Sequence, residues 1–126
     1  MFLRFVITQI DEDSHQPQGV FAAAYDLLES GKLNSVEEKH LREILVWFEE
    51  NLHSPEDYFK AQRAVFWFKS SADESIKRIW ELVNLLRLHE HHVEVYKCRR
   101  LANIAYEDKL QVAAYPSERD GKITVQ

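Results

Sequence analysis

The sequence is poor in residues that bring special chemistry or backbone freedom: its 126 residues include one cysteine, three glycines and three prolines. Because Cys98 is alone, no disulfide can form within the chain, and such a thiol is typical of a reducing cytoplasm. The sequence has no glycine-rich loop that could cradle a phosphate. It also has no apolar run near the ~20 residues of a membrane span. We therefore expect a cytoplasmic protein without a membrane segment.

Positive charge is scarce as well. The chain has 16 Lys and Arg against 21 Asp and Glu, which gives a net charge of −5. An acidic chain is repelled by phosphate backbones, so we expect no nucleic-acid partner. The deficit lies in residues 1–62, which hold five basic and twelve acidic residues; residues 63–126 hold eleven and nine. The second half can therefore still present a local basic edge.

Apolar and aromatic side chains are plentiful, at 45% and 12% of the sequence. This composition and length predict one folded domain over residues 1–126. The stretch from 64 to 98 indicates its centre. Residues 64–69 form an apolar, aromatic strand, residues 72–89 show helical spacing, and residues 92–98 alternate with period two. Together they predict a βαβ unit whose two strands run parallel with a right-handed crossover.

The other segments predict a strand at 2–10, a helical hairpin at 19–52 and a β-hairpin at 103–115. Residues 2–10 are apolar on both faces, which favours an interior strand over a signal peptide, because acidic residues follow directly. The second strand of the β-hairpin carries little charge and is expected at a sheet edge. We thus expect an α+β domain with a mixed sheet of four or five strands.

Three local signals mark helix boundaries. Ser35 with Glu38, and Ser71 with Glu74, have the spacing of capping boxes and predict helix starts. Gly31 is placed to end a helix in the left-handed conformation. Pro55, after a serine and before two acids, predicts a short helix to about residue 61.

The predicted βαβ unit also generates a candidate ligand site. The carboxyl ends of parallel strands meet at one edge, where open α/β sheets tend to bind ligands. Free N–H groups at the helix start and two guanidinium groups could hold a phosphate or carboxylate there. The simpler interpretation is that Ser71 caps the helix and the arginines face solvent. The candidate residues are Lys69, Ser70, Ser71, Arg99 and Arg100.

Histidine and acidic clusters raise the question of metal binding. His89, His91 and His92 lie at a helix-to-strand junction, where their side chains should diverge, and the helical His-Glu-x-x-His spacing is absent. The segment 11–15, with three acids and a histidine, could bind a cation if the first strand ran parallel to the central one. A solvated acidic loop explains it more simply. We expect no metal and no other cofactor.

Two functional hypotheses follow. The first is a small interaction or regulatory module without catalytic machinery that forms a homodimer, through exposed apolar residues such as Val46 and Trp47 or through an edge strand. The alternative is a small-molecule binding protein or enzyme that takes an anionic ligand at the Ser70, Ser71, Arg99 and Arg100 edge. A concave pocket at that edge would favour the alternative, whereas a flat apolar surface near Trp47 would favour the interaction module.

Protein purified without a histidine tag should hold no stoichiometric zinc or nickel, because the side chains of the histidine cluster diverge. Elemental analysis of the purified chain measures this directly. A content of about one metal ion per chain that disappears in His91→Ala would contradict the prediction.

Overall fold

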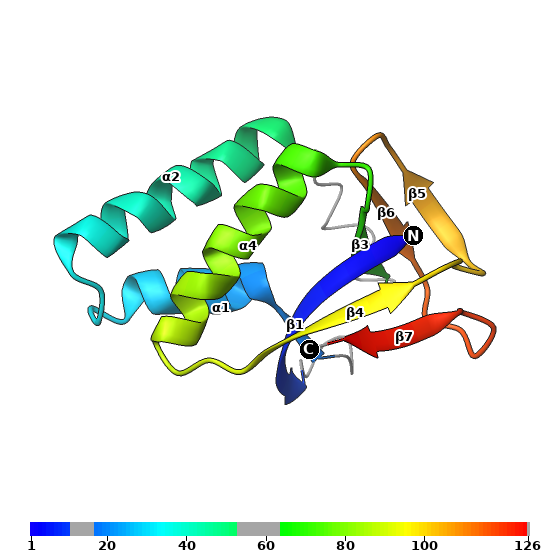
Figure 1. Cartoon of the computed structure of the whole chain (residues 1–126), viewed down its shortest axis with the longest axis horizontal. Coiled ribbons are helices and arrows are strands. Elements are labelled where there is room, and N and C mark those ends of the chain that lie inside the picture. The colour runs from blue at the N-terminus through cyan, green and yellow to red at the C-terminus, as the bar shows by residue number, and fades with distance from the viewer. Residues whose placement is uncertain (11–16, 53–63, 126) are drawn as a thin grey trace.

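The computed structural model describes residues 1–10, 17–52 and 64–125, in which three helices cover one face of a seven-stranded sheet (Figure 1). Two predicted segments, the acidic loop at 11–15 and the short helix from Pro55 to about residue 61, lie outside the described residues. The described part contains no helix with the length and apolar character needed to span a membrane. The helices are α1 (Val20–Glu29), α2 (Ser35–Asn51) and α4 (Asp73–Leu88). The strands are β1 (Phe2–Ile10), β2 (Pro17–Gly19), β3 (Val65–Lys69), β4 (Val93–Cys98), β5 (Ile104–Glu107), β6 (Gln111–Ala114) and β7 (Lys122–Val125).

The α+β class and the strand–helix–strand unit β3–α4–β4 are confirmed. The strand order is β5-β6-β3-β1-β4-β7, and β2 pairs with β1 outside this path. Every described pair is antiparallel, so the expectation of a mixed sheet is wrong in this respect. The strands β3 and β4 run in the same direction, but β1 lies between them and pairs with both. The sheet exceeds the expected four or five strands because β2 and β7 also join it.

Each face of the sheet carries a cluster of buried apolar side chains. On the helix side, Phe5 and Ile7 of β1 and Phe68 of β3 contact the buried stripes of the three helices. On the other face, Val65 and Trp67 of β3 pack with Val112 of β6 in a smaller cluster. Because side chains alternate along a strand, β1 and β3 supply residues to both clusters. This explains why both segments are apolar at odd and even positions.

The helix ends match the sequence signals only in part. Gly31 has φ +75° and follows the end of α1, as predicted. The capping box of α2 is formed by Asn34 and Glu37, one residue before the predicted Ser35 and Glu38. Asn34 is extended, at φ −75° and ψ 171°, so its side chain reaches the N–H of Glu37.

At the start of α4, the predicted capping box of Ser71 and Glu74 does not form. Ala72 occupies the N-cap position without a side-chain cap. The carbonyl group of Ser71 instead accepts the N–H of Asp73, which tightens the turn between β3 and α4. Asp73 and Glu74 still place negative charge in the first turn, where the helix dipole favours it.

The C-terminal β-hairpin is confirmed as β5 and β6, but its second strand does not lie at an edge. β6 pairs with β5 on one side and β3 on the other, and all four of its residues are buried. The edge strand is β5. Asp108 fixes the turn: its carboxylate accepts the N–H groups of Leu110 and Gln111 and the hydroxyl of Tyr106. Burial alone would raise the pKa of Asp108, but these hydrogen bonds hold it below its ordinary value.

Val65→Asp should abolish cooperative folding. Val65 is 7% exposed in an interior strand, and a carboxylate in its apolar cluster would have no partner. Thermal unfolding followed by circular dichroism measures the effect. Val36→Asp is the matched control, because Val36 is 76% exposed in the first turn of α2. A Val65→Asp variant that unfolds like the wild type would contradict the assignment of β3 as a central strand.

Candidate functional site

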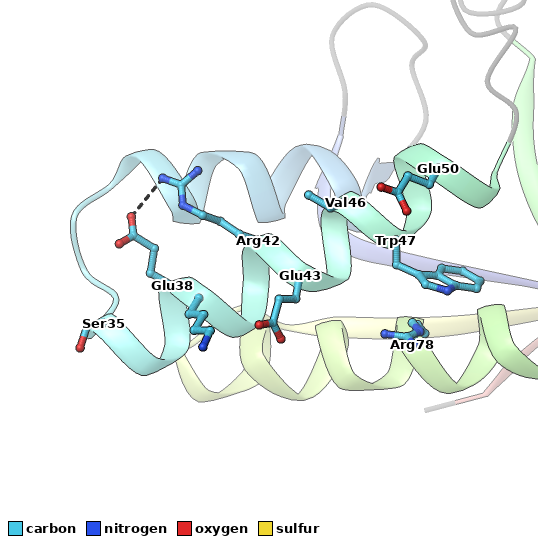
Figure 2. Close-up of a pocket in the computed structure, with 9 residues that line it drawn as sticks. Ser35, Glu38, Arg42, Glu43, Val46, Trp47, Glu50 and Arg78 are labelled. Atoms are coloured by element: carbon cyan, nitrogen blue, oxygen red, sulfur yellow. Dashed lines mark hydrogen bonds and ion pairs between the residues drawn. The ribbon is translucent and has the colours of Figure 1, made fainter.

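The outer side of α2 carries a stripe of residues outside the fully buried core. The buried residues of α2 are Leu41, Ile44, Leu45 and Phe48. On another side of the helix, residues recurring every three or four positions border an open hollow of about 520 Å³ together with one residue of α4 (Figure 2). The hollow is lined by Ser35, Glu38, Lys39, Arg42, Glu43, Val46, Trp47, Glu50 and Arg78.

Trp47 is the largest side chain in this hollow. It is partly buried at the margin of the core, and its ring lies edge-on to Phe48 with the ring centroids 5.0 Å apart. The guanidinium of Arg78 lies 5.0 Å from the centre of the Trp47 ring, a cation–π distance. Glu74, one helical turn away, forms an ion pair with Arg78 at 2.9 Å. The indole ring therefore packs between the margin of the core and a cation of α4.

The rest of the hollow combines exposed apolar surface with balanced charge. Val46 is 46% exposed although it lies in the middle of α2. Its neighbours in the hollow are three carboxylates and three cations, so the lining is neutral while the whole chain carries −5. Neutral, partly apolar surface suits contact with another protein better than binding of a charged small molecule.

The start of α2 is fixed to the end of α4 by Glu37. One carboxylate oxygen of Glu37 accepts the Asn34 N–H at 3.1 Å, and the other lies 3.0 Å from Nε2 of His89. The Asn34 hydrogen bond, followed by His89, holds the pKa of Glu37 below its ordinary value of 4.5. A second link joins the same helices where His40 Nε2 lies 3.5 Å from Glu81. The relative position of the two helices that border the hollow is therefore specified by polar contacts as well as packing.

The sequence-predicted anion site lies elsewhere, at the carboxyl ends of β3 and β4. Phe2 of β1 pairs with Lys69 on one side and with Cys98 on the other. This register brings Ser70 and Ser71 to one side of β1 and Arg99 and Arg100 to the other. The predicted residues thus share one end of the sheet, with a strand between the two groups.

Several of these residues already have partners. The ammonium group of Lys69 forms an ion pair with Glu107. The N–H of Ser70 donates to the carbonyl of Met1. The backbone of Arg99 and Arg100 exchanges two hydrogen bonds with Gly121, at 3.0 and 3.2 Å. Ser70, Ser71 and both arginines are exposed, so the structure places this group on the surface at the strand ends.

Two of the three histidines of the junction, His89 and His92, lie beside different carboxylates. His89 faces Glu37, whereas Nε2 of His92 lies 3.5 Å from Glu94 of β4. Among residues 1–10, 17–52 and 64–125, no three side chains of His, Cys, Asp or Glu gather into a metal-binding group. The thiol of Cys98 is fully buried and donates to the carbonyl of Arg100 at 2.7 Å.

Sequence reasoning identified Trp47 and Val46 as exposed candidates but did not identify Arg78, Glu37 or His89 as their supports. The Arg78 contact had a partial signal, because Glu74 and Arg78 have the i,i+4 spacing of a helical ion pair. The Glu37–His89 contact had no signal in the sequence, because the two residues are 52 positions apart. Comparison with protein-family models, curated proteins and solved structures finds no match to this chain.

Glu37→Gln should remove part of the acid dependence of stability. Because the folded state lowers the pKa of Glu37, its ionised carboxylate contributes stability above about pH 4.5 that is lost as the pH falls through the lowered value. The difference in unfolding free energy between wild type and Glu37→Gln should therefore shrink from pH 6 to about pH 3. Glutamine can still accept the Asn34 N–H, so the cap is retained. Urea unfolding across this pH range measures the difference. A free-energy difference that does not change with pH would contradict the lowered pKa of Glu37.

Proposed function

We propose that this chain is a small cytoplasmic interaction module without catalytic machinery, which works by self-association into a homodimer. The observation that supports this most is the hollow on α2 and α4, where Val46 and Trp47 lie at the surface within a neutral set of charges. Aromatic side chains and arginine are enriched at protein interfaces, and Trp47 and Arg78 form such a pair. The lone buried thiol of Cys98 is compatible with a reducing compartment.

The sheet edge at β5 is a poorer contact than α2. An exposed edge strand can pair with another chain through its free backbone groups, unless the strand is short, irregular or charged. β5 has four residues, and its pairing with β6 shifts register between Ile104 and Tyr106. Its last residue, Glu107, adds a charge that pairs with Lys69. All three features oppose extension of the sheet at β5, which favours the helical surface over this edge.

A second candidate function is binding of an anionic small molecule at the strand ends. The register that sets Lys69 and Cys98 on the two sides of Phe2 supports it, since the chain then leads Ser70, Ser71, Arg99 and Arg100 to one end of the sheet. Lys69 is paired with Glu107, however, and the arginines are exposed. The 520 Å³ hollow lies at α2 instead. We therefore place the interaction module first.

Wild-type protein should shift from dimer to monomer across a hundredfold dilution at moderate salt, whereas Val46→Arg should stay monomeric. The substitution puts an unpaired charge where apolar surface would be buried. Analytical ultracentrifugation measures both masses. Val36→Arg is the matched control, because Val36 is exposed on the same helix and does not line the hollow. A monomeric mass for the wild type at every concentration would overturn the proposed function.

A further inference from the structure

Opposite charges lie at equal distances on either side of Val46, the exposed apolar residue in the middle of α2. Arg42 lies four residues before Val46, and Glu50 lies four residues after it. All three line the hollow, and residues four apart on a helix lie on one side. We propose that two copies of the chain pair through antiparallel α2 helices about a two-fold axis at Val46, with Arg42 of each copy facing Glu50 of the partner subunit. This inference rests on the proposed self-association.

The two-fold symmetry determines which residues meet. In an antiparallel pair of identical helices, each residue faces the residue equally far from the axis on the opposite side of the centre. Val46 then contacts Val46 of the partner subunit at the axis. One Arg42–Glu50 pair forms on each side of this contact, so a single exposed valine is enclosed by two ion pairs. This is the arrangement of an apolar centre with a polar rim that interfaces commonly show.

Both charged groups are available in the single chain. The guanidinium of Arg42 lies 3.2 Å from Glu38, but the two side chains are 60% and 46% exposed. Such an exposed pair contributes little and does not hold Arg42 in place. Glu50 is exposed, and the described residues give its carboxylate no ion pair. In the dimer, Arg42 would bridge Glu38 and Glu50 of the partner subunit.

Like charges are kept apart in this arrangement. Glu43 and Glu49 also lie equally far from Val46 and would repel if they faced each other. Glu49 accepts the hydroxyl of Tyr25 at 2.8 Å, which directs it towards α1. Glu43 instead extends towards α4 (Figure 2). They therefore project from different sides of α2, and the two-fold operation does not bring them together.

The flank of the contact is equally suited to a second copy. Trp47 and Arg78 lie on the α4 side, the side to which Glu43 also extends (Figure 2). The two-fold operation leaves the α4 sides of both copies on one side of the helix pair. The cation of Arg78 therefore comes near Glu43 of the partner subunit. The hollow-lining charges of each copy sum to zero, which lets two chains of −5 meet with little repulsion at the contact.

Charge reversal tests the pairing. Arg42→Glu alone, or Glu50→Arg alone, makes both interchain pairs repulsive and should raise the dimer Kd roughly tenfold at low salt. The double variant Arg42→Glu/Glu50→Arg restores two attractive pairs, and its Kd should return to within about threefold of the wild type. Sedimentation equilibrium measures all four constants. Circular dichroism verifies that each variant is folded.

The controls reverse matched charges away from the hollow. Asp26 is exposed on α1 and Lys77 is exposed on α4, so Asp26→Arg, Lys77→Glu and their combination should each keep the wild-type Kd. If the wild type dimerises but the Kd of the double variant rises by the product of the two single-variant increases, the antiparallel pairing is overturned while the proposed self-association stands. A wild type that never dimerises would overturn both this pairing and the proposed function.

Discussion

The structure depends on the pairing of β1 with two strands that run in the same direction. β1 contacts β4 from Phe2 to Ile7, and on its other side it contacts β3 at its start and β2 towards its end. A strand in this position has no free edge along its first residues and has neighbours on both faces. Its apolar residues at alternate positions therefore enter two cores, and the sheet cannot form without it.

The insertion of β1 also determines the positions of the helices. Since β3 and β4 are separated by a strand, α4 must cross over β1 to connect them, and it packs there with α1 and α2 on one face (Figure 1). The carboxyl ends of β3 and β4 are held apart for the same reason. A compact ligand site between the two strand ends would require them to be adjacent, so the strand order weakens the anion site that the sequence suggested.

Much of this fold could be predicted from sequence because its signals are local. The apolar periodicities of β1, α2 and α4 identify these elements, and Gly31 marks the end of α1. The strand order could not be predicted, because periodicity shows which residues are buried and not which strand buries them. The Asn34 cap was missed for a related reason. Asn34 and Ser35 are both good caps, and only the extended backbone of Asn34 decides between them.

The candidate interaction surface shows the same division between local and tertiary information. The helical spacing of Val46 and Trp47 places them at the margin of the buried stripe of α2, and this spacing is readable from the sequence alone. Arg78 and His89 come from α4, and their approach to α2 depends on how the helices cross the sheet. The net charge of the chain argues against helix-to-helix association, but net charge is a sum over the whole surface. What governs a contact is the charge within it, and the α2 hollow, with three cations and three carboxylates, is neutral where the chain as a whole is not.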